Sequence, residues 1–236
     1  MNVILGAGLA MAGSDISKDG GPGDAMLLAA LLAVRLCHDI SGPLSTLMGS
    51  LELVAEDPAS AAEALPLAGE AATALAQRLR LMRAAWGDAA GALGMAAFRA
   101  LAAQPAGGRR LELILDVADP AAQFTPGAAR LALNMLLLAQ EGLPHGGQVR
   151  FAGDPGGDMV VTIAGPRAAW PAGFAAYLAA EPRAWAALRG AGELDAARGM
   201  QALLTALIAH RSGLKLSFLM AASADAPPVL MRLAAR

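Results

Sequence analysis

The sequence predicts an α+β fold, in which an N-terminal helical hairpin precedes a sandwich of helices on one face of a sheet. Apolar residues spaced three and four apart fill residues 24–88, the pattern of amphipathic helices. After residue 91, helical segments alternate with short strands. Aromatic residues make up 4% of a chain that is 56% hydrophobic, which suits helix-on-helix packing of Leu, Ala and Val. We expect a disordered leader over residues 1–23, the hairpin over 24–88 and the sandwich over 92–236.

The first helix is predicted from Ala25 to about Glu56, with Asp24 as its N-cap. Pro43 lies inside this helix and is expected to remove one backbone hydrogen bond and kink the axis. Asp57 and Pro58 end the helix, since a proline disfavours helical geometry in the residue before it. One apolar stripe, the seam of a bundle, is expected from Leu36, Ile40, Leu44, Leu47, Leu51 and Val54.

The second helix is predicted from Ala61 to about Trp86, and Gly87 stops it. Ser60 is its expected N-cap, with Glu63 three residues on as the partner in a capping box. Two long amphipathic helices joined by a short loop form a helical hairpin. Alone, the hairpin leaves a wide apolar face, so we expect it to pair with a second copy into a four-helix bundle.

The second half of the chain mixes helices and strands, which predicts an α/β sandwich. A stretch rich in tryptophan, residues 168–192, has no clear pattern. The other expected elements are a helix at 95–103, a strand at 111–117, a helix at 126–141, strands at 148–152 and 159–164, a helix at 195–211, and strands at 214–221 and 229–233.

Composition excludes several classes of function. A formal net charge of −2 gives no basic field for nucleic acid. The single cysteine, Cys37, rules out an internal disulfide, is expected to be buried beside the seam, and fits a reducing, cytoplasmic compartment. The apolar residues 3–12 are too few to span a bilayer, which needs about 20, and no Lys or Arg precedes them as in a secretion signal. We therefore expect no membrane anchor, and the three scattered histidines predict no metal site.

His38 is the most informative residue of the chain. At 3.6 residues per turn it lies roughly 200° round the helix from Ile40, on the face opposite the seam. Its helical neighbours there are polar, namely Arg35, Ser41, Ser45 and Glu52. An imidazole held towards water on a rigid helix is a poor choice for packing but a good phosphoryl acceptor.

The segment HDISGPL, residues 38–44, resembles the phosphoacceptor box of sensor histidine kinases. Residues 131–151 resemble the asparagine box of their ATP-binding domain, with Asn134 at its first asparagine and Gly146 and Gly147 at its closing glycines. Leu138, however, stands where the kinases place an asparagine that ligates magnesium. An apolar side chain cannot coordinate a cation that requires oxygen ligands.

Two further boxes of the kinases are degraded in this sequence. Where the kinases carry Asp-x-Gly-x-Gly, Gly165 replaces the aspartate that reads adenine, and Arg167 and Ala169 replace the glycines. Of the flexible glycines that ring the nucleotide, only Gly199 is left. The resemblance therefore predicts a domain of the kinase type that does not bind ATP.

The combination of box, hairpin and degenerate domain is similar to the ChpT-type bacterial histidine phosphotransferases. This resemblance implies a homodimer in which His38 accepts a phosphoryl group from a receiver-domain aspartate of a hybrid histidine kinase and passes it to response-regulator aspartates. It implies no cofactor on this chain, with magnesium only on the partner receiver. Asp39 is expected to orient the imidazole, and the expected partner-binding residues are Arg35, Ser41, Gly42 and Ser45. Two alternatives stay open: a docking scaffold without catalysis that binds response regulators, and an active kinase with an unusual nucleotide pocket.

Overall fold

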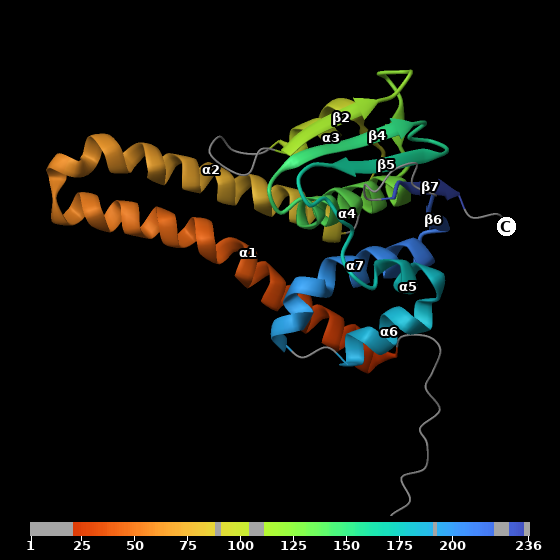
Figure 1. The fold of residues 1–236 in the computed structure, drawn as a ribbon. Helices are drawn as coiled ribbons and strands as arrows, with labels where there is room; N and C mark the ends of the chain where they lie inside the picture. Colours follow the sequence, from red (N-terminus) through yellow and green to blue (C-terminus); the bar gives the residue numbers. More distant parts are fainter. Residues whose placement is uncertain (1–20, 88–90, 104–110, 191–192, 220–226, 234–236) are drawn as a thin grey trace, which may run out of the picture.

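A helical hairpin projects from an α/β sandwich in the computed structural model (Figure 1). The structure describes residues 21–87, 91–103, 111–190, 193–219 and 227–233. Helix α1 (Pro22–Glu56) and helix α2 (Ala61–Trp86) run side by side, joined by the 3₁₀ turn η1 (Pro58–Ser60). The α+β fold that the sequence predicts is confirmed.

The start of α1 differs from the prediction. The helix begins at Pro22, two residues inside the expected leader, and the rest of that leader, residues 1–20, lies outside the described residues. Asp24 is not the N-cap but a residue of the first turn, where its carboxylate accepts a hydrogen bond of 3.0 Å from the backbone N–H of Gly21. Proline at the first helical position leaves no N–H to satisfy there, which favours the earlier start.

The turn between the two helices also corrects an expectation. Ser60 is the N-cap residue of α2, as predicted, but its side chain makes no capping hydrogen bond; its hydroxyl donates instead to the carbonyl oxygens of Leu53, at 3.2 Å, and Asp57, at 2.7 Å. Asp57 caps the 3₁₀ turn by accepting from the N–H of Ala59. Helix α1 continues through Pro43, and α2 ends at Gly87 as predicted.

The sandwich contains a five-stranded sheet in the order β2-β4-β5-β7-β6. Strand β2 pairs in parallel with β4, and the remaining neighbours are antiparallel. Two residue pairs form a separate small sheet of β1 (Leu93–Gly94) and β3 (Gln123–Phe124) that the sequence did not predict. The strands of the main sheet are β2 (Leu111–Asp116), β4 (Gly147–Gly153), β5 (Met159–Ala164), β6 (Leu214–Phe218) and β7 (Val229–Leu233).

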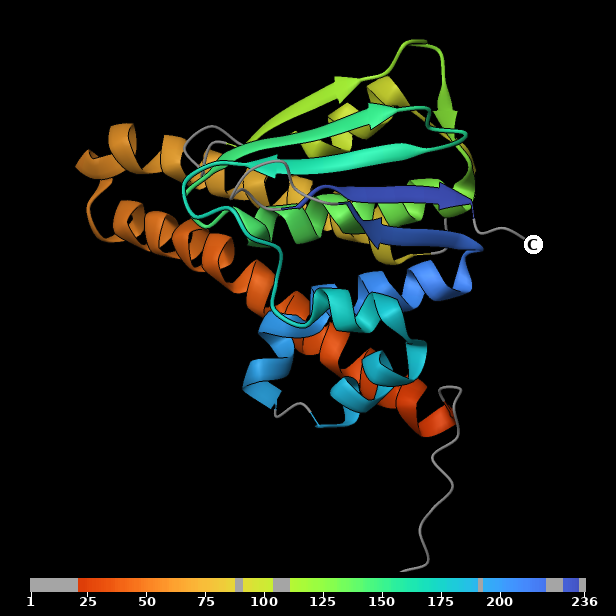
Figure 2. The same ribbon diagram turned by 45° about the vertical axis from the view of Figure 1, so that its right-hand side comes forward.

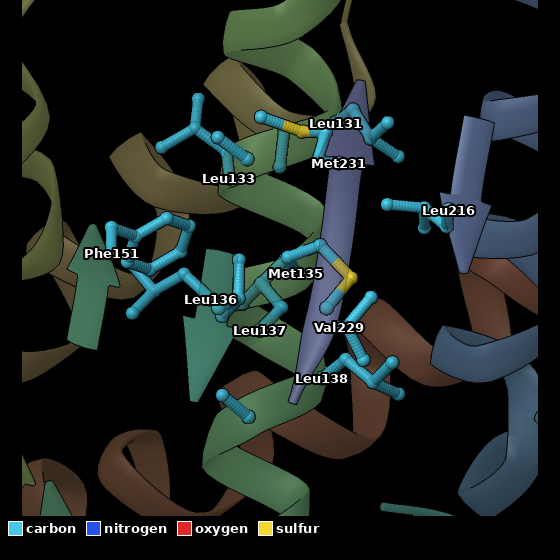
Figure 3. Packing of buried hydrophobic residues seen from close by; sticks show 14 of the residues in the cluster. Leu131, Leu133, Met135, Leu136, Leu137, Leu138, Phe151, Leu216, Val229 and Met231 are labelled. Atoms are coloured by element: carbon cyan, nitrogen blue, oxygen red, sulfur yellow. The ribbon is translucent and has the colours of Figure 1, made fainter. Parts of the chain in front are cut away.

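Helices α3 (Met95–Ala102), α4 (Pro126–Gly142) and α7 (Glu193–Arg211) lie on one face of this sheet (Figures 1 and 2). On β4 the side chains of Val149 and Phe151 are buried, whereas Gln148 and Arg150 are exposed, which is the alternation of a sheet covered on one face. Every residue of α4 from 131 to 139 is buried, so this helix forms the centre of the core (Figure 3).

The stretch without a clear pattern forms two helices, α5 (Phe174–Ala179) and α6 (Glu181–Gly190). Trp185 of α6 joins a buried apolar cluster with Leu31 of α1 and with side chains of α7. The first part of α1 thus packs against α6 and α7 before the helix reaches α2, as both ribbon views show (Figures 1 and 2). Arg189 of α6 adds an ion pair of 2.6 Å with Asp24. The two halves of the chain are joined through a shared helix.

Among the described residues, α1 is the helix that is long and apolar enough to cross a membrane. Length and composition also select the mostly buried core helices of soluble proteins and signal sequences near an N-terminus, and 11% of this apolar window is buried. Helix α1 carries Arg35, His38 and Asp39 near its middle.

Candidate functional site

His38 is open to solvent while its neighbour Asp39 is buried. The exposed fraction of the side chain is 73% for His38 and 8% for Asp39. Nδ1 of His38 lies 3.2 Å from Oδ1 of Asp39. An ionised carboxylate can only accept hydrogen bonds, so the proton of this contact belongs to Nδ1. In the neutral ring the lone pair is then on Nε2, the form needed for a nucleophile.

Two guanidinium groups hold the other oxygen of Asp39. Arg35 donates from Nε to Oδ2 at 3.0 Å, and Arg78 of α2 donates from Nη2 to the same oxygen at 2.7 Å. Burial raises the pKa of Asp39, but the charges and hydrogen bonds of Arg78 and Arg35 outweigh burial and hold this pKa below its ordinary value. Asp39 is therefore a carboxylate at neutral pH, as the contact with His38 requires.

Arg35 does not lie where the sequence placed it. It was predicted on the solvent face beside His38, but it is buried, with a relative exposure of 9%. Its guanidinium points to helix α4, where Nη2 lies 2.6 Å from Oε1 of Glu141. Burial raises the pKa of this glutamate above its ordinary value in spite of Arg35. A helical wheel of α1 alone cannot show that α4 covers part of the polar face of α1.

The other residues predicted to bind a partner are exposed around His38. The Ser41 hydroxyl donates to the carbonyl oxygen of Cys37 at 2.6 Å, and Ser45 is also exposed. A side chain at Gly42 would meet no atom within 4 Å. Cys37 is exposed rather than buried as expected. The surface beside the imidazole is thus made of small residues that leave room for a partner.

Three residues of this site were not found from the sequence: Arg78, Gln140 and Glu141. Arg78 donates from Nη1 to Oε1 of Gln140 at 2.7 Å, so its two nitrogens bridge α1 and α4. These residues line, with Arg35 and Asp39, an open cavity of about 630 Å³. No spacing in the sequence marks them, because they meet only through the packing of α4 against the hairpin.

The residues that match the asparagine box are used inside the fold. Asn134 is fully buried; its amide donates to the carbonyl oxygens of Ala85, at 2.7 Å, and Arg130, and its own oxygen accepts from Gln201 at 2.9 Å. Leu138 is fully buried among apolar side chains of the core (Figure 3). These contacts bind the end of α2 to α4 and α7.

The loop at the position of Asp-x-Gly-x-Gly packs closely against the backbone of residues 146 and 147. A Cβ at Gly165 would lie 2.6 Å from the carbonyl oxygen of Gly146, so an aspartate would not fit without a shift of the backbone. Arg167, at a position where the kinases have glycine, keeps a left-handed φ of 60°. In the part of the chain that the structure describes, no group of three His, Cys, Asp or Glu side chains is placed to hold a metal.

Comparison with known proteins places the chain in a family. Residues 95–224 match the family described as the histidine phosphotransferase C-terminal domain, which covers more than half of the chain. The chain belongs to the histidine phosphotransferase family. This histidine phosphotransferase is 30% identical over 201 residues to the protein phosphotransferase ChpT of Brucella abortus (strain 2308), a match that covers 82% of this chain and 90% of the relative.

A solved structure described as a bacterial phosphotransferase is also similar to this histidine phosphotransferase. It superposes with a TM-score of 0.65 and 27% identity, over 88% of this chain and 95% of the other. A histidine kinase from Burkholderia phymatum STM815 reaches a TM-score of 0.34 at 17% identity, over 91% of this chain and all of the other, too low a score to carry an argument. The predicted resemblance to ChpT-type proteins is confirmed, and the family supports a phosphotransfer role in a phosphorelay.

Proposed function

We propose that His38 is the phosphoacceptor of a cytoplasmic bacterial phosphorelay, and that it takes its phosphoryl group from a receiver aspartate rather than from ATP. The observation that carries the proposal is an exposed imidazole whose Nδ1 contacts a buried carboxylate. A receiver domain of a hybrid histidine kinase is the donor, and response-regulator aspartates are the acceptors. Family membership supports this role.

The transfer needs little from this chain. The lone pair of Nε2 attacks the phosphorus of the aspartyl phosphate, an N–P bond forms, and the acyl P–O bond breaks with its electrons on the leaving receiver carboxylate. The His38 ring keeps its proton on Nδ1 and gains a positive charge, which the carboxylate of Asp39 stabilises. The lone pair returns to Nε2 when the phosphoryl group moves to the next aspartate. The receiver supplies the magnesium ion, and positioning supplies most of the catalysis.

The degraded boxes support transfer without ATP. The amide of Asn134 is bound to Ala85 and Gln201, Leu138 offers no oxygen to magnesium, and no acid fits at Gly165. Isothermal titration of the protein with ATP and magnesium should show no binding. A measurable binding heat would favour the kinase alternative.

The proposal includes a homodimer formed through the hairpin. Leu44, Met48 and Leu51 repeat at intervals of four and three along α1, and each is between 42% and 49% exposed. On α2, Leu65 and Leu67 are about half exposed. The apolar row on α1 and the exposed leucines of α2 need a partner surface, and a second copy completes a four-helix bundle.

The test uses a purified receiver domain that carries labelled phosphate on its aspartate. The wild-type protein should take up the label as an adduct that is labile in acid and stable in base, and His38→Ala should take up none while keeping its fold. His145→Ala is the matched control, because His145 is the other exposed histidine among the described residues. If His38→Ala still accepts label, the site assignment is wrong. If the wild type binds the receiver but leaves its phosphate in place, the protein is a scaffold.

A further inference from the structure

The hydrogen bonds of Asp39, beside His38, are connected to the C-terminal half of the chain through Arg78. Its Nη2 donates to Oδ2 of Asp39 on α1, and its Nη1 donates to Oε1 of Gln140 on α4, each at 2.7 Å. Arg78 itself belongs to α2, so one side chain joins three helices. A guanidinium is a rigid plane, and two hydrogen bonds from two of its nitrogens fix its orientation.

The two carboxylate oxygens of Asp39 contact different residues. Oδ2 receives both guanidinium groups, whereas Oδ1 faces Nδ1 of His38. Fixing Oδ2 therefore fixes the plane of the carboxylate and with it the place of Oδ1. Because Asp39 has only 8% of its side chain exposed, the two guanidinium groups, rather than bulk solvent, hold its oxygen Oδ2.

We infer that Arg78, held in place by Gln140, is a positioning residue for the phosphoacceptor. It holds Asp39 so that His38 keeps its proton on Nδ1 and its lone pair on Nε2. The C-terminal half thereby acts on the imidazole through α4, a role that needs no nucleotide. The inference rests on the proposed function of His38, although its main readout is the state of the ring and not phosphotransfer.

Arg35 does not replace Arg78 in this role. Its contact with Asp39 is longer, at 3.0 Å, and its Nη2 is drawn towards Glu141. Without Arg78, Oδ2 of Asp39 keeps one hydrogen-bond donor, Arg35, which also forms an ion pair with Glu141. The carboxylate then loses the shorter of its two guanidinium contacts and its link to Gln140, and only the longer contact with Arg35 holds Oδ2.

The test combines four variants. Arg78→Met removes both hydrogen bonds of the guanidinium, Arg78→Lys keeps the charge but not the rigid fork, and Gln140→Leu removes only the anchor on α4. The control is Arg80→Met, which changes an exposed arginine two residues along the same helix, about 200° away from Arg78. The tautomer of His38 is read by long-range ¹H–¹⁵N NMR of the labelled protein above the pH at which the ring is protonated, and circular dichroism checks the fold.

In the wild type and in Arg80→Met we expect His38 to hold its proton on Nδ1. In Arg78→Met the fraction of His38 rings with the proton on Nε2 should rise. In Arg78→Lys this fraction should lie between those of the wild type and Arg78→Met, and in Gln140→Leu it should also be higher than in the wild type. Transfer from a phosphorylated receiver should fall by about tenfold in Arg78→Met. An unchanged tautomer in both Arg78→Met and Gln140→Leu overturns the inference, and if Arg78→Met does not fold, Gln140→Leu decides. If the tautomer shifts in these variants but the wild type transfers no phosphate, the proposed function is refuted, while the control of the His38 ring by Arg78 stands.

Discussion

Replacing Leu51 by glutamate should separate the proposed dimer into monomers. Leu51 follows Met48 in the apolar row on α1 and has 45% of its surface exposed in the single chain. The same row carries Leu44, so the position lies at the end of a contact that a second copy would cover. In a symmetric dimer each substitution is present twice.

The magnitude follows from the exposed fraction. Burying a whole leucine side chain gives about 2 kcal/mol, so covering the remaining half gives about 1 kcal/mol for each copy of Leu51. A glutamate at this place loses that gain and must also leave water, which costs about 1 kcal/mol or more for each partly buried carboxylate. The sum of about 4 kcal/mol weakens association by roughly a thousandfold.

Light scattering after size exclusion, at micromolar protein, measures the result. The wild type should have twice the mass of the 23.8 kDa chain, and Leu51→Glu should have the mass of one chain. Thr46→Glu is the matched control, since Thr46 is exposed and polar on the same helix, about 140° from Leu51. The reasoning fails if Leu51→Glu keeps the dimeric mass, or if the wild type is already a monomer.

Two further substitutions test the buried contacts. The lowered pKa of Asp39 means that its ion pairs add stability above its ordinary pKa near 4 and lose it as pH falls through the lowered value. Urea unfolding should therefore show Asp39→Asn less stable than the wild type by about 2–3 kcal/mol at pH 7, and this gap should close as the pH falls through the lowered pKa of Asp39; a gap that does not change with pH would contradict the assignment. Leu31 of α1 is 4% exposed and packs against α6. Leu31→Ala should therefore lower the free energy of unfolding by about 2–4 kcal/mol. A loss below about 1 kcal/mol, typical of a surface substitution, would show that α1 and α6 do not pack tightly.

The sequence predicted the features that depend on one helix or one strand at a time. The apolar periodicity placed α1 and α2 correctly, Gly87 marked the end of α2, and the 200° offset from Ile40 put His38 on the solvent side. Strands β4 and β5 were found because the turn residues 153–157 between them are a local signal. The mixture of helices and strands predicted the sandwich of the second half, and the family resemblance added its likeness to a degenerate kinase domain.

The failures involve contacts between elements. Arg35 has polar neighbours along its own helix, and only the approach of α4 with Glu141 makes it a buried residue. Arg78 and Gln140 are 62 positions apart in the sequence, so no spacing pairs them. Helices α5 and α6 were missed because they are short, with 6 and 10 residues, and span too few turns to show a clear apolar period.

The shared helix α1 has a consequence for any attempt to divide this protein. Leu31 lies in the first part of α1, a helix of the hairpin, but completes the hydrophobic interior around Trp185 of the C-terminal half. A fragment cut after Gly87 would take the first part of α1 away from the C-terminal half. Both pieces would then expose the apolar side chains of the cluster around Trp185. Grafting a hairpin from a relative would likewise succeed only if the opening turns of α1 were kept with the sandwich they close.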